Sequence, residues 1–189
     1  MAVAGCATVP EAAEAHSRAQ AALAVINQMN SQPRTAAALR NAQAVLIVLD
    51  YAKAGFILGA QGGDGVLLTR HDGHWGDPAF CTLGGVSIGL QAGIETGPVA
   101  YLLMSPRAVQ EFDPRKGKTH LGADAGLTVV RFSSATNMVS TLASADVIVW
   151  TGTAGLFGGV AFDSAHVVAD PQLDEAYSRG PAPGAPDSR

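Results

Sequence analysis

Charged residues are scarce in this sequence. Asp, Glu, Lys and Arg make up 15% of its 189 residues, well below the roughly 25% of a typical globular protein. The net charge of −4 provides no general basic field, which argues against nucleic acid as a partner. No apolar run reaches the roughly 18–20 residues that a membrane-spanning helix needs. With two cysteines, the chain also lacks the means for a disulfide scaffold.

Glycine is abundant instead, and it falls within apolar, β-prone segments. The chain has 22 glycines, many of them between Lys53 and Gly93. Glycine inside a strand costs conformational entropy and offers no side chain to pack. A sheet that accepts it so often needs bulges, sharp curvature or close backbone approach. The sequence therefore predicts a strongly curved sheet.

The overall pattern predicts an α+β fold, with N-terminal helices packed on a curved, Gly-rich antiparallel β-sheet. Strong helix formers over Glu11–Met29 and Arg34–Ala44 indicate the two N-terminal helices. Ser105-Pro106 and Asp170-Pro171 each combine an N-cap with a first-turn proline, so short helices are expected after the middle strands and at the C-terminus. Short connections leave little room for parallel crossovers. The expected strands are 45–49, 56–60, 65–70, 79–83, 86–94, 99–104, 120–123, 127–132, 147–151 and 156–162.

We expect three segments along the chain: a tether over residues 1–10, one domain over 11–179 and a disordered tail over 180–189. Val3-Ala4-Gly5-Cys6 resembles the lipobox of bacterial lipoproteins, in which the cysteine receives acyl chains. The residues before Cys6 are too few for an n-region and an h-region, so this prediction requires a longer precursor. It makes Cys6 a lipid anchor and places the domain in the bacterial cell envelope, on the periplasmic or surface side.

Motifs for catalysis and metal binding are weak. Gly85-Val-Ser87-Ile-Gly89 has the spacing of a nucleophile elbow, but that motif needs a strand–turn–helix context, and the sequence continues in β style. His71-Asp-Gly-His74 is more typical of a hairpin turn than of a metal site. We therefore predict no catalytic residues, metal or cofactor. A small serine hydrolase using Ser87 stays as an alternative.

Positive charge is concentrated in one short stretch, Arg115-Lys116-Gly-Lys118. Each Lys or Arg held against an anionic membrane contributes about 1 kcal/mol. Three such residues support weak, salt-sensitive contact, and stable anchoring usually needs a second signal such as an acyl chain. Arg115, Lys116 and Lys118 are therefore the first candidates for binding anionic lipid.

Several motifs between Arg34 and Asp170 resemble the SYLF-domain family. The resemblance implies a non-enzymatic domain that binds phosphoinositides and other anionic lipids, and in eukaryotes also actin. The motifs are Lys53-Ala-Gly-Phe56, the strand Gly65–Arg70, Trp75-x-x-Pro78, Gly89-x-Gln91-x-Gly93, Leu121-Gly-Ala-Asp124 and Gly155-Leu-Phe-x-Gly159.

The resemblance adds four candidate lipid-binding residues. Lys53 and Arg70 lie in matching motifs, and Arg34 and Arg40 lie in the predicted second helix, which corresponds to the helical segment that the family uses. One family lysine is replaced by Ala154. The predicted function is non-catalytic binding of anionic or phosphoinositide-like lipid by a membrane-anchored lipoprotein. An envelope protein–protein interaction module is the other alternative.

Overall fold

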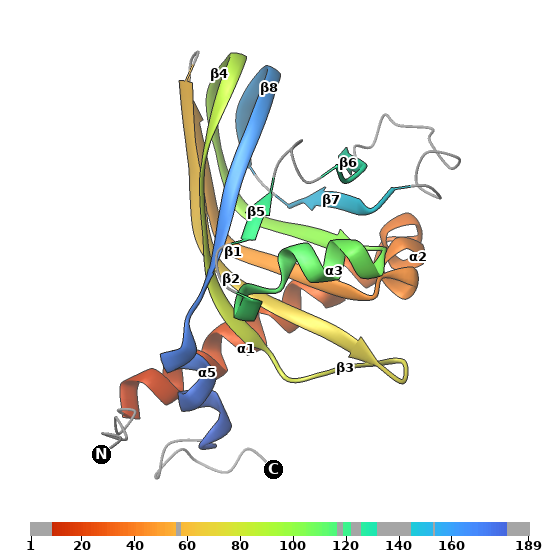
Figure 1. The fold of residues 1–189 in the computed structure, drawn as a ribbon, viewed down its shortest axis with the longest axis vertical. Coiled ribbons are helices and arrows are strands. Elements are labelled where there is room, and N and C mark those ends of the chain that lie inside the picture. Colours follow the sequence, from red (N-terminus) through yellow and green to blue (C-terminus); the bar gives the residue numbers. More distant parts are fainter. Residues whose placement is uncertain are drawn as a thin grey trace.

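The computed structural model describes residues 9–55, 58–116, 119–121, 126–131, 145–152 and 154–180 (Figure 1). The helices are α1 (Val9–Asn30), α2 (Pro33–Asn41), α3 (Pro106–Phe112) and α5 (Pro171–Ser178), with a 3₁₀ helix η1 (Pro114–Lys116). The strands are β1 (Ala44–Gly55), β2 (Leu58–His71), β3 (His74–Trp75), β4 (Ala79–Leu103), β5 (Thr119–Leu121), β6 (Val129–Arg131), β7 (Val147–Thr151) and β8 (Ala154–Ala169). This is the predicted α+β class.

The helices begin and end close to where the sequence places them. Ser105 caps α3 by accepting a hydrogen bond from the amide of Ala108, and Asp170 caps α5 in the same way through Leu173. In both helices the first-turn proline follows the cap, as expected. The buried side of α1 consists largely of alanines at three- and four-residue spacing, which allows the helix to lie close against the sheet.

Two of the described strands are longer than predicted, because each combines segments that were expected to be separate strands. The segments 79–83, 86–94 and 99–104 belong to one 25-residue strand, β4, and 56–60 and 65–70 both contribute to β2. Glycines that looked like strand ends instead allow these strands to continue through sharp bends. The first half of β4 pairs with β2 and its second half pairs with β1, so these three strands close on themselves.

The remaining strands extend this closed unit. Strand β8 pairs along the other edge of β4, from Cys81 to Thr96, and β7 pairs with the last residues of β4. All these pairs are antiparallel, as expected. The pair β6–β7 is parallel, so the sheet is mixed and mostly antiparallel.

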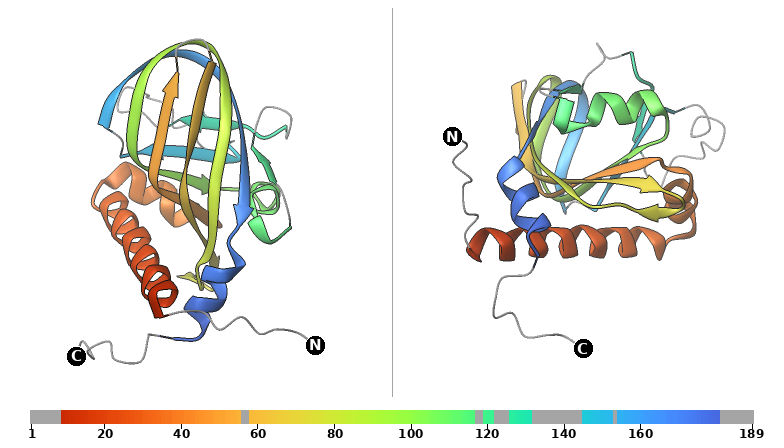
Figure 2. Two further views of the ribbon diagram at one scale, coloured as in Figure 1. Left: turned by 90° about the vertical axis from the view of Figure 1, so that its left-hand side faces the viewer. Right: turned by 60° about the horizontal axis from the view of Figure 1, so that its bottom comes forward.

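The described helices cover both faces of the sheet at one end (Figure 2). On one face α1, α2 and α5 pack on alternate residues of the central strands, including Val45, Ile47, Phe80 and Leu102. On the other face α3 contributes Ala108 and Phe112. In Figure 2 the strands continue well beyond α1 and curl over at the far end.

A bulge in β1 separates the covered end from this far end. The register with both neighbouring strands shifts between Val48 and Ala52. Opposite the bulge, a Cβ on Gly63 would lie 2.7 Å from Cγ1 of Val48 and 3.0 Å from the amide nitrogen of Tyr51. Glycine is therefore required at this position by the close approach of the two backbones.

We call the far end the tip and define it as residues 52–55 of β1, 58–62 of β2 and 84–96 of β4. Lys53 and Gln61 are buried on its inner side, while Ala52, Ala54 and Ala60 are exposed on its outer side. The tip is therefore a curled end of the sheet with one internal and one external face.

Candidate functional site

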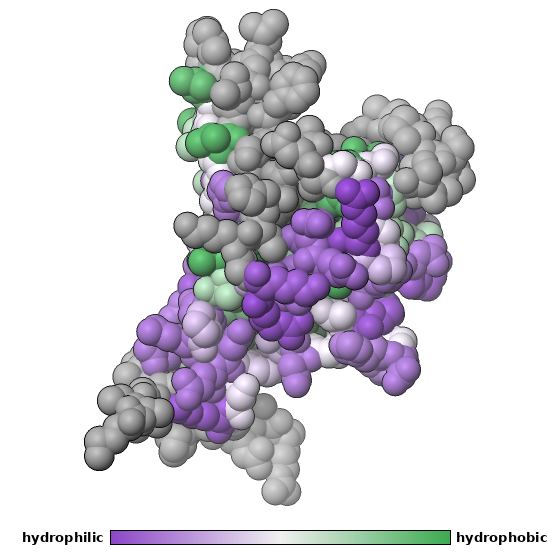
Figure 3. Space-filling view, viewed as in Figure 1, coloured by the Kyte–Doolittle hydropathy of each residue, from purple (hydrophilic) through white to green (hydrophobic). Residues whose placement is uncertain are grey.

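The predicted basic cluster lies on η1, directly after α3. Arg115 and Lys116 are both exposed, and neighbouring Pro114 is buried, which fixes the turn to the body of the domain. Lys118 lies outside the described residues. Figure 3 shows a broad hydrophilic surface over this part of the molecule.

Asp113 offsets part of the charge of this cluster. Its carboxylate accepts hydrogen bonds from the Nε of Arg115 at 2.9 Å and from the backbone amide of Arg115 at 3.1 Å. The hydrogen bond to Asp113 is the main cause of a raised pKa for the guanidinium of Arg115. Arg115 is thus positioned with its side chain 60% exposed, but Asp113 offsets its charge, one of the two cationic charges of the cluster that the structure describes.

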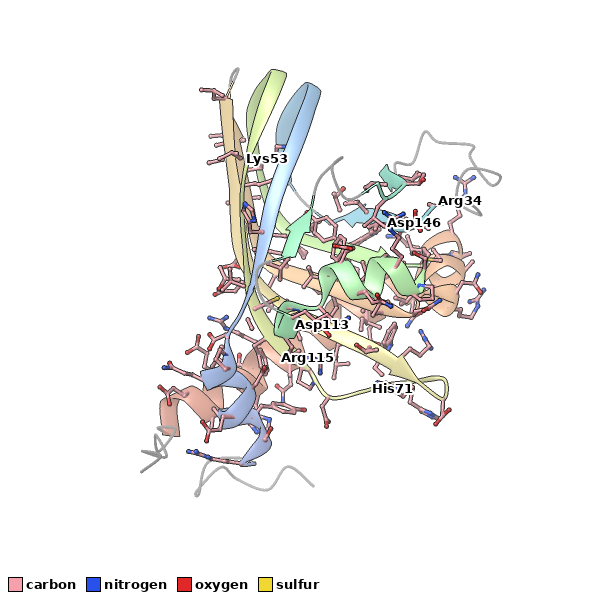
Figure 4. The ribbon with its side chains drawn as sticks, in the orientation of Figure 1. Arg34, Lys53, His71, Asp113, Arg115 and Asp146 are labelled. Atoms are coloured by element: carbon pink, nitrogen blue, oxygen red, sulfur yellow. The ribbon has the colours of Figure 1, made fainter. Side chains whose placement is uncertain are left out.

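Arg34 and Arg40 are exposed on α2. Figure 4 shows Arg34 well separated from Arg115 on η1. Arg40 lies in the last turn of α2, where a cation is favourable to the helix dipole. Neither arginine takes part in an ion pair within the described part of the chain. The structure therefore keeps both side chains available to solvent, but it does not bring them together with Arg115.

Lys53 occupies an interior position. Its side chain is 2% exposed, and its backbone pairs with Gln61 on β2 and with Glu95 on β4. Nearby, the hydroxyl of Tyr51 lies 2.7 Å from Oε1 of Gln61. A buried lysine inside the tip cannot present its ammonium to a headgroup without opening the strands around it.

Arg70 is held by backbone carbonyls. Its guanidinium donates to Leu39 at 2.9 Å, Ala42 at 3.1 Å and Gly73 at 3.0 Å, and it stacks over the Trp75 ring at 4.0 Å. The first two carbonyls lie at the C-terminal end of α2, where a cation interacts favourably with the helix dipole. Arg70 therefore joins α2 to the β2–β3 hairpin, and its hydrogen-bonding groups are already engaged.

The two motifs considered for catalysis and metal binding lie in ordinary elements of the sheet: Ser87 in a strand and residues 71–74 in a hairpin turn. Ser87 lies in the middle of β4, paired with Gly59 and Asp163, so the turn and helix of a nucleophile elbow do not follow it. Asp72 and Gly73 have φ values of 50° and 85° and form the predicted hairpin turn. The part of the chain that the structure describes contains no group of three or more residues suited to hold a metal.

Two further titratable groups have shifted pKa values because of their place in the fold. Burial, with smaller contributions from Asp174 and Asp64, raises the pKa of the Cys81 thiol to about 12. Burial also raises the pKa of Asp174, although its carboxylate accepts a 2.7 Å hydrogen bond from the amide of Phe80. Asp174 belongs to the packing between α5 and β4, whereas Cys81 lies in the core on the face that α3 covers, so we assign both groups structural roles.

The sequence prediction did not include the large apolar residues of the tip. Leu58, Val86 and Ile94 are 70%, 60% and 64% exposed. Their alternation along the strands is visible in the sequence. That none of the helices the structure describes covers them could not be read from the sequence, because cover depends on where α1 lies in space.

The geometry defines a class of α+β domain in which long, Gly-rich strands curl on themselves and helices cover one end of the sheet. Residues 84–181 match the family described as Ysc84, Las17-binding protein actin regulator. The chain therefore belongs to the Ysc84 family of SYLF domains, in agreement with the resemblance found in its motifs.

Similar proteins come from animals and fungi. SH3 domain-containing YSC84-like protein 1 of Bos taurus is 33% identical over 136 residues, which cover 70% of this chain and 39% of that protein. Protein YSC84 of Saccharomyces cerevisiae is 28% identical over 127 residues, or 65% of this chain and 27% of that protein. The chain thus matches less than half the length of these relatives. No solved structure matches it significantly.

Proposed function

We propose that this chain is a non-catalytic lipid-binding domain that engages anionic membrane surfaces. The observation that carries the proposal is the exposed Arg115–Lys116 pair, held on a turn that buried Pro114 fixes to the domain. Positive charge on a fixed, exposed turn attracts anionic headgroups, including those of phosphoinositides. Membership of the SYLF family supports the same assignment.

The expected strength of this contact follows from the net charge of the cluster. Asp113 offsets one of the two described cations, and Lys118 adds one more from the sequence. At about 1 kcal/mol for each unit of net charge, the cluster contributes on the order of 2 kcal/mol. This is a weak contact, and Arg34 and Arg40 on α2 provide the next exposed cations. Lys53 and Arg70, which are engaged inside the fold, support the domain structurally.

A vesicle-binding series tests the proposal. The parent protein should bind vesicles that contain phosphatidylglycerol or a phosphoinositide more tightly than vesicles of phosphatidylcholine alone. Replacing Arg115, Lys116 and Lys118 with Ser should weaken binding to anionic vesicles by about 10- to 30-fold at low salt, with less effect at high salt. An Arg34→Ser/Arg40→Ser variant compares the contribution of α2. If the parent binds anionic and neutral vesicles equally poorly, the proposal is wrong.

We propose further that Cys6, which lies outside the described residues, is the acylated anchor of an envelope lipoprotein. An acyl chain would provide the second signal that weak electrostatic contact needs. None of the helices in the described part of the chain is long and apolar enough to cross a bilayer. Mass spectrometry of the native protein extracted from membranes should find acyl groups on Cys6, and an unmodified Cys6 would exclude the anchor.

Binding of a protein partner is the second candidate function. The family description names a Las17-binding actin regulator, and the relatives from cattle and Schizosaccharomyces pombe are named as SH3 domain-containing proteins. Co-sedimentation with actin filaments tests the partner class that this description suggests. Saturable co-sedimentation without lipid would favour this candidate.

The hydrolase alternative has its own test. With Ser87 in the middle of β4, we expect no ester hydrolysis above the blank and no change in vesicle binding for Ser87→Ala. Turnover of an ester panel that disappears in Ser87→Ala would establish a hydrolase.

A further inference from the structure

One face of the sheet changes from covered to bare along the same strands. Near α1 this face carries Val45 and Ile47 of β1 and Val66 and Leu68 of β2, all buried beneath helices. The ion pair between Arg18 of α1 and Asp64 of β2, at 2.7 Å, marks where this cover ends. Beyond it the same face continues into the tip, and none of the described helices lies over it there (Figure 2).

The bare part of this face is a continuous apolar surface. In register across the strands, Ile94 pairs with Ala54, Ala54 with Ala60, and Ala60 with Val86. Residues paired in this way have side chains roughly 5 Å apart on the same face. Leu58 lies two residues from Ala60 and therefore shares the face. We call these five residues, with Ala52, the outer face of the tip.

The outer face of the tip exposes large apolar side chains to solvent. Leu58, Val86 and Ile94 are each at least 60% exposed, and the three alanines between them are exposed too. Figure 3 shows apolar surface along the upper left edge of the molecule, at this end of the sheet. A contiguous exposed apolar patch of this kind marks a contact with a membrane, a ligand or another protein.

Charge distinguishes among these occupants. The described side chains on the outer face of the tip carry no charge: Lys53 lies on the inner side and is 2% exposed, and exposed Thr96, which pairs with Ala52, is polar but uncharged. Protein interfaces combine an apolar centre with a polar rim and hydrogen-bonding groups. A largely apolar, uncharged and protruding surface is better matched to the acyl region just below lipid headgroups.

The backbones of β1 and β2 at the tip are paired on both sides. Residues 52–55 of β1 pair with β2 on one side and with β4 on the other. Residues 59–62 of β2 likewise pair with β1 and β4. In hydrocarbon every unpaired amide or carbonyl is costly, so paired strands can enter where an open sheet edge cannot. The same pairing leaves β1 and β2 no free edge on which another protein could add a strand.

We infer that the outer face of the tip is the surface by which this domain inserts into the interfacial region of a lipid bilayer. The inference rests on the proposed lipid-binding function and assigns it a second, apolar contact. Figure 4 shows Lys53, inside the tip, well separated from Arg115 on η1, so the two contacts belong to different parts of the domain. The apolar contact should be insensitive to salt, whereas the contact through η1 is screened by it.

The test compares two triple variants of the full chain. The tip variant carries Leu58→Ser, Val86→Ser and Ile94→Ser. The matched control carries Leu23→Ser, Val129→Ser and Val168→Ser, which replace apolar residues that are 46%, 54% and 48% exposed elsewhere on the surface. Binding to vesicles of phosphatidylcholine and phosphatidylglycerol is measured at low and high salt. Thermal unfolding and sedimentation velocity are measured for all three proteins.

We expect the tip variant to lose at least about tenfold in affinity at both salt concentrations, since each large apolar side chain withdrawn from water contributes roughly an order of magnitude. The control should bind as the parent does. If the parent binds but the tip variant binds equally well, the inference is wrong and the proposed function stands. If the parent binds no vesicles, both fail. If the tip substitutions convert a dimer to a monomer without changing lipid affinity, the outer face of the tip is a protein interface and the inference is overturned.

Discussion

The covered end of the sheet and the tip are built from the same three strands, yet they differ in almost every physical respect. At the covered end both faces carry large side chains such as Leu46, Ile47 and Phe80, and all three are fully buried. At the tip the strands carry alanine or glycine at half of their positions, and the large apolar residues Leu58, Val86 and Ile94 are exposed. The comparison shows that strand pairing alone does not bury a surface: helices must be placed over it.

The difference also separates stability from binding. Burial of large apolar side chains is the main favourable contribution to folding, so the covered end should dominate the free energy of unfolding. Exposed apolar residues at the tip contribute little to that free energy. Substitutions at the covered end should therefore mainly lower the free energy of unfolding, whereas substitutions at the tip should mainly weaken binding.

We expect the largest difference in the free energy of unfolding between two truncations, Phe80→Ala and Ile94→Ala, which lie at opposite ends of the same face of β4. Phe80→Ala removes a fully buried ring and should lower the free energy of unfolding by about 3–5 kcal/mol. Ile94→Ala, at a side chain that is 64% exposed, should change it by less than about 0.5 kcal/mol. Chemical denaturation of both variants measures the difference. Equal destabilisation would contradict the contrast between the two ends.

A pair of glycine substitutions should give an intermediate effect. Gly63→Ala brings a Cβ to 2.7 Å from Val48 and 3.0 Å from the backbone of Tyr51, and we expect a loss of about 1–3 kcal/mol. Gly84→Ala meets nothing within 4 Å and should be neutral or stabilising by up to about 1 kcal/mol. Thermal unfolding of the two proteins checks this prediction. A stable Gly63→Ala protein would mean that the bulge in β1 does not depend on close backbone approach.

Removing a contact between α5 and the covered end should lower the free energy of unfolding somewhat less than Gly63→Ala does. Asp174→Ala removes the acceptor of the Phe80 amide and should cost about 1–2 kcal/mol, whereas Asp174→Asn keeps an acceptor oxygen and should cost less. Burial raises the pKa of Asp174, so its protonated form is favoured in the folded state. Its contribution to stability through ionisation is therefore present below the unfolded pKa and is lost as the pH rises. Denaturation of the parent and Asp174→Asn across acidic pH tests the sign.

The reaction rates of cysteines with a thiol reagent should differ between the two ends of the sheet. We expect no change in the free energy of unfolding at neutral pH. Cys81 is fully buried, and with its pKa raised to about 12 it should not react with a thiol reagent at pH 8 in the folded protein. A cysteine introduced as Ala54→Cys at the exposed tip should react at the rate of a free thiol. Both are measured with Cys6→Ser in place. Above pH 9 the unfolded Cys81 ionises while the folded thiol does not, so its contribution to stability is lost as the pH rises toward 12.

The sequence predicted the fold class and the helices because their signals are local. The Ala-rich segments, the N-caps and the first-turn prolines act within a few residues, and the corresponding helices lie close to the predicted positions. The continuity of β4 was not predicted, because glycine both ends strands and bends them. Which of these occurs depends on the partners β1, β2 and β8, which are distant in the sequence.

The candidate site residues likewise fall into two groups, those whose exposure could be predicted locally and those whose position depends on distant parts of the chain. Exposure of Arg115, Lys116, Arg34 and Arg40 followed from their polar surroundings. The interior position of Lys53 and the three carbonyl contacts of Arg70 could not be anticipated, because they depend on the curl of the tip and on the position of α2. The tip was not predicted for a related reason: it is distinctive because the described helices leave it uncovered, and not because of its composition.

Fluorescence quenching from within the bilayer tests the central claim most directly. An environment-sensitive fluorophore is attached at Ala54→Cys on the tip or at Ala24→Cys on α1, both exposed alanines, with Cys6→Ser in each protein. The proteins are mixed with anionic vesicles whose acyl chains carry spin labels. We predict strong quenching at position 54 and none beyond the background at position 24. Vesicle-bound protein that shows no quenching at position 54, or stronger quenching at position 24, would contradict the insertion of the tip.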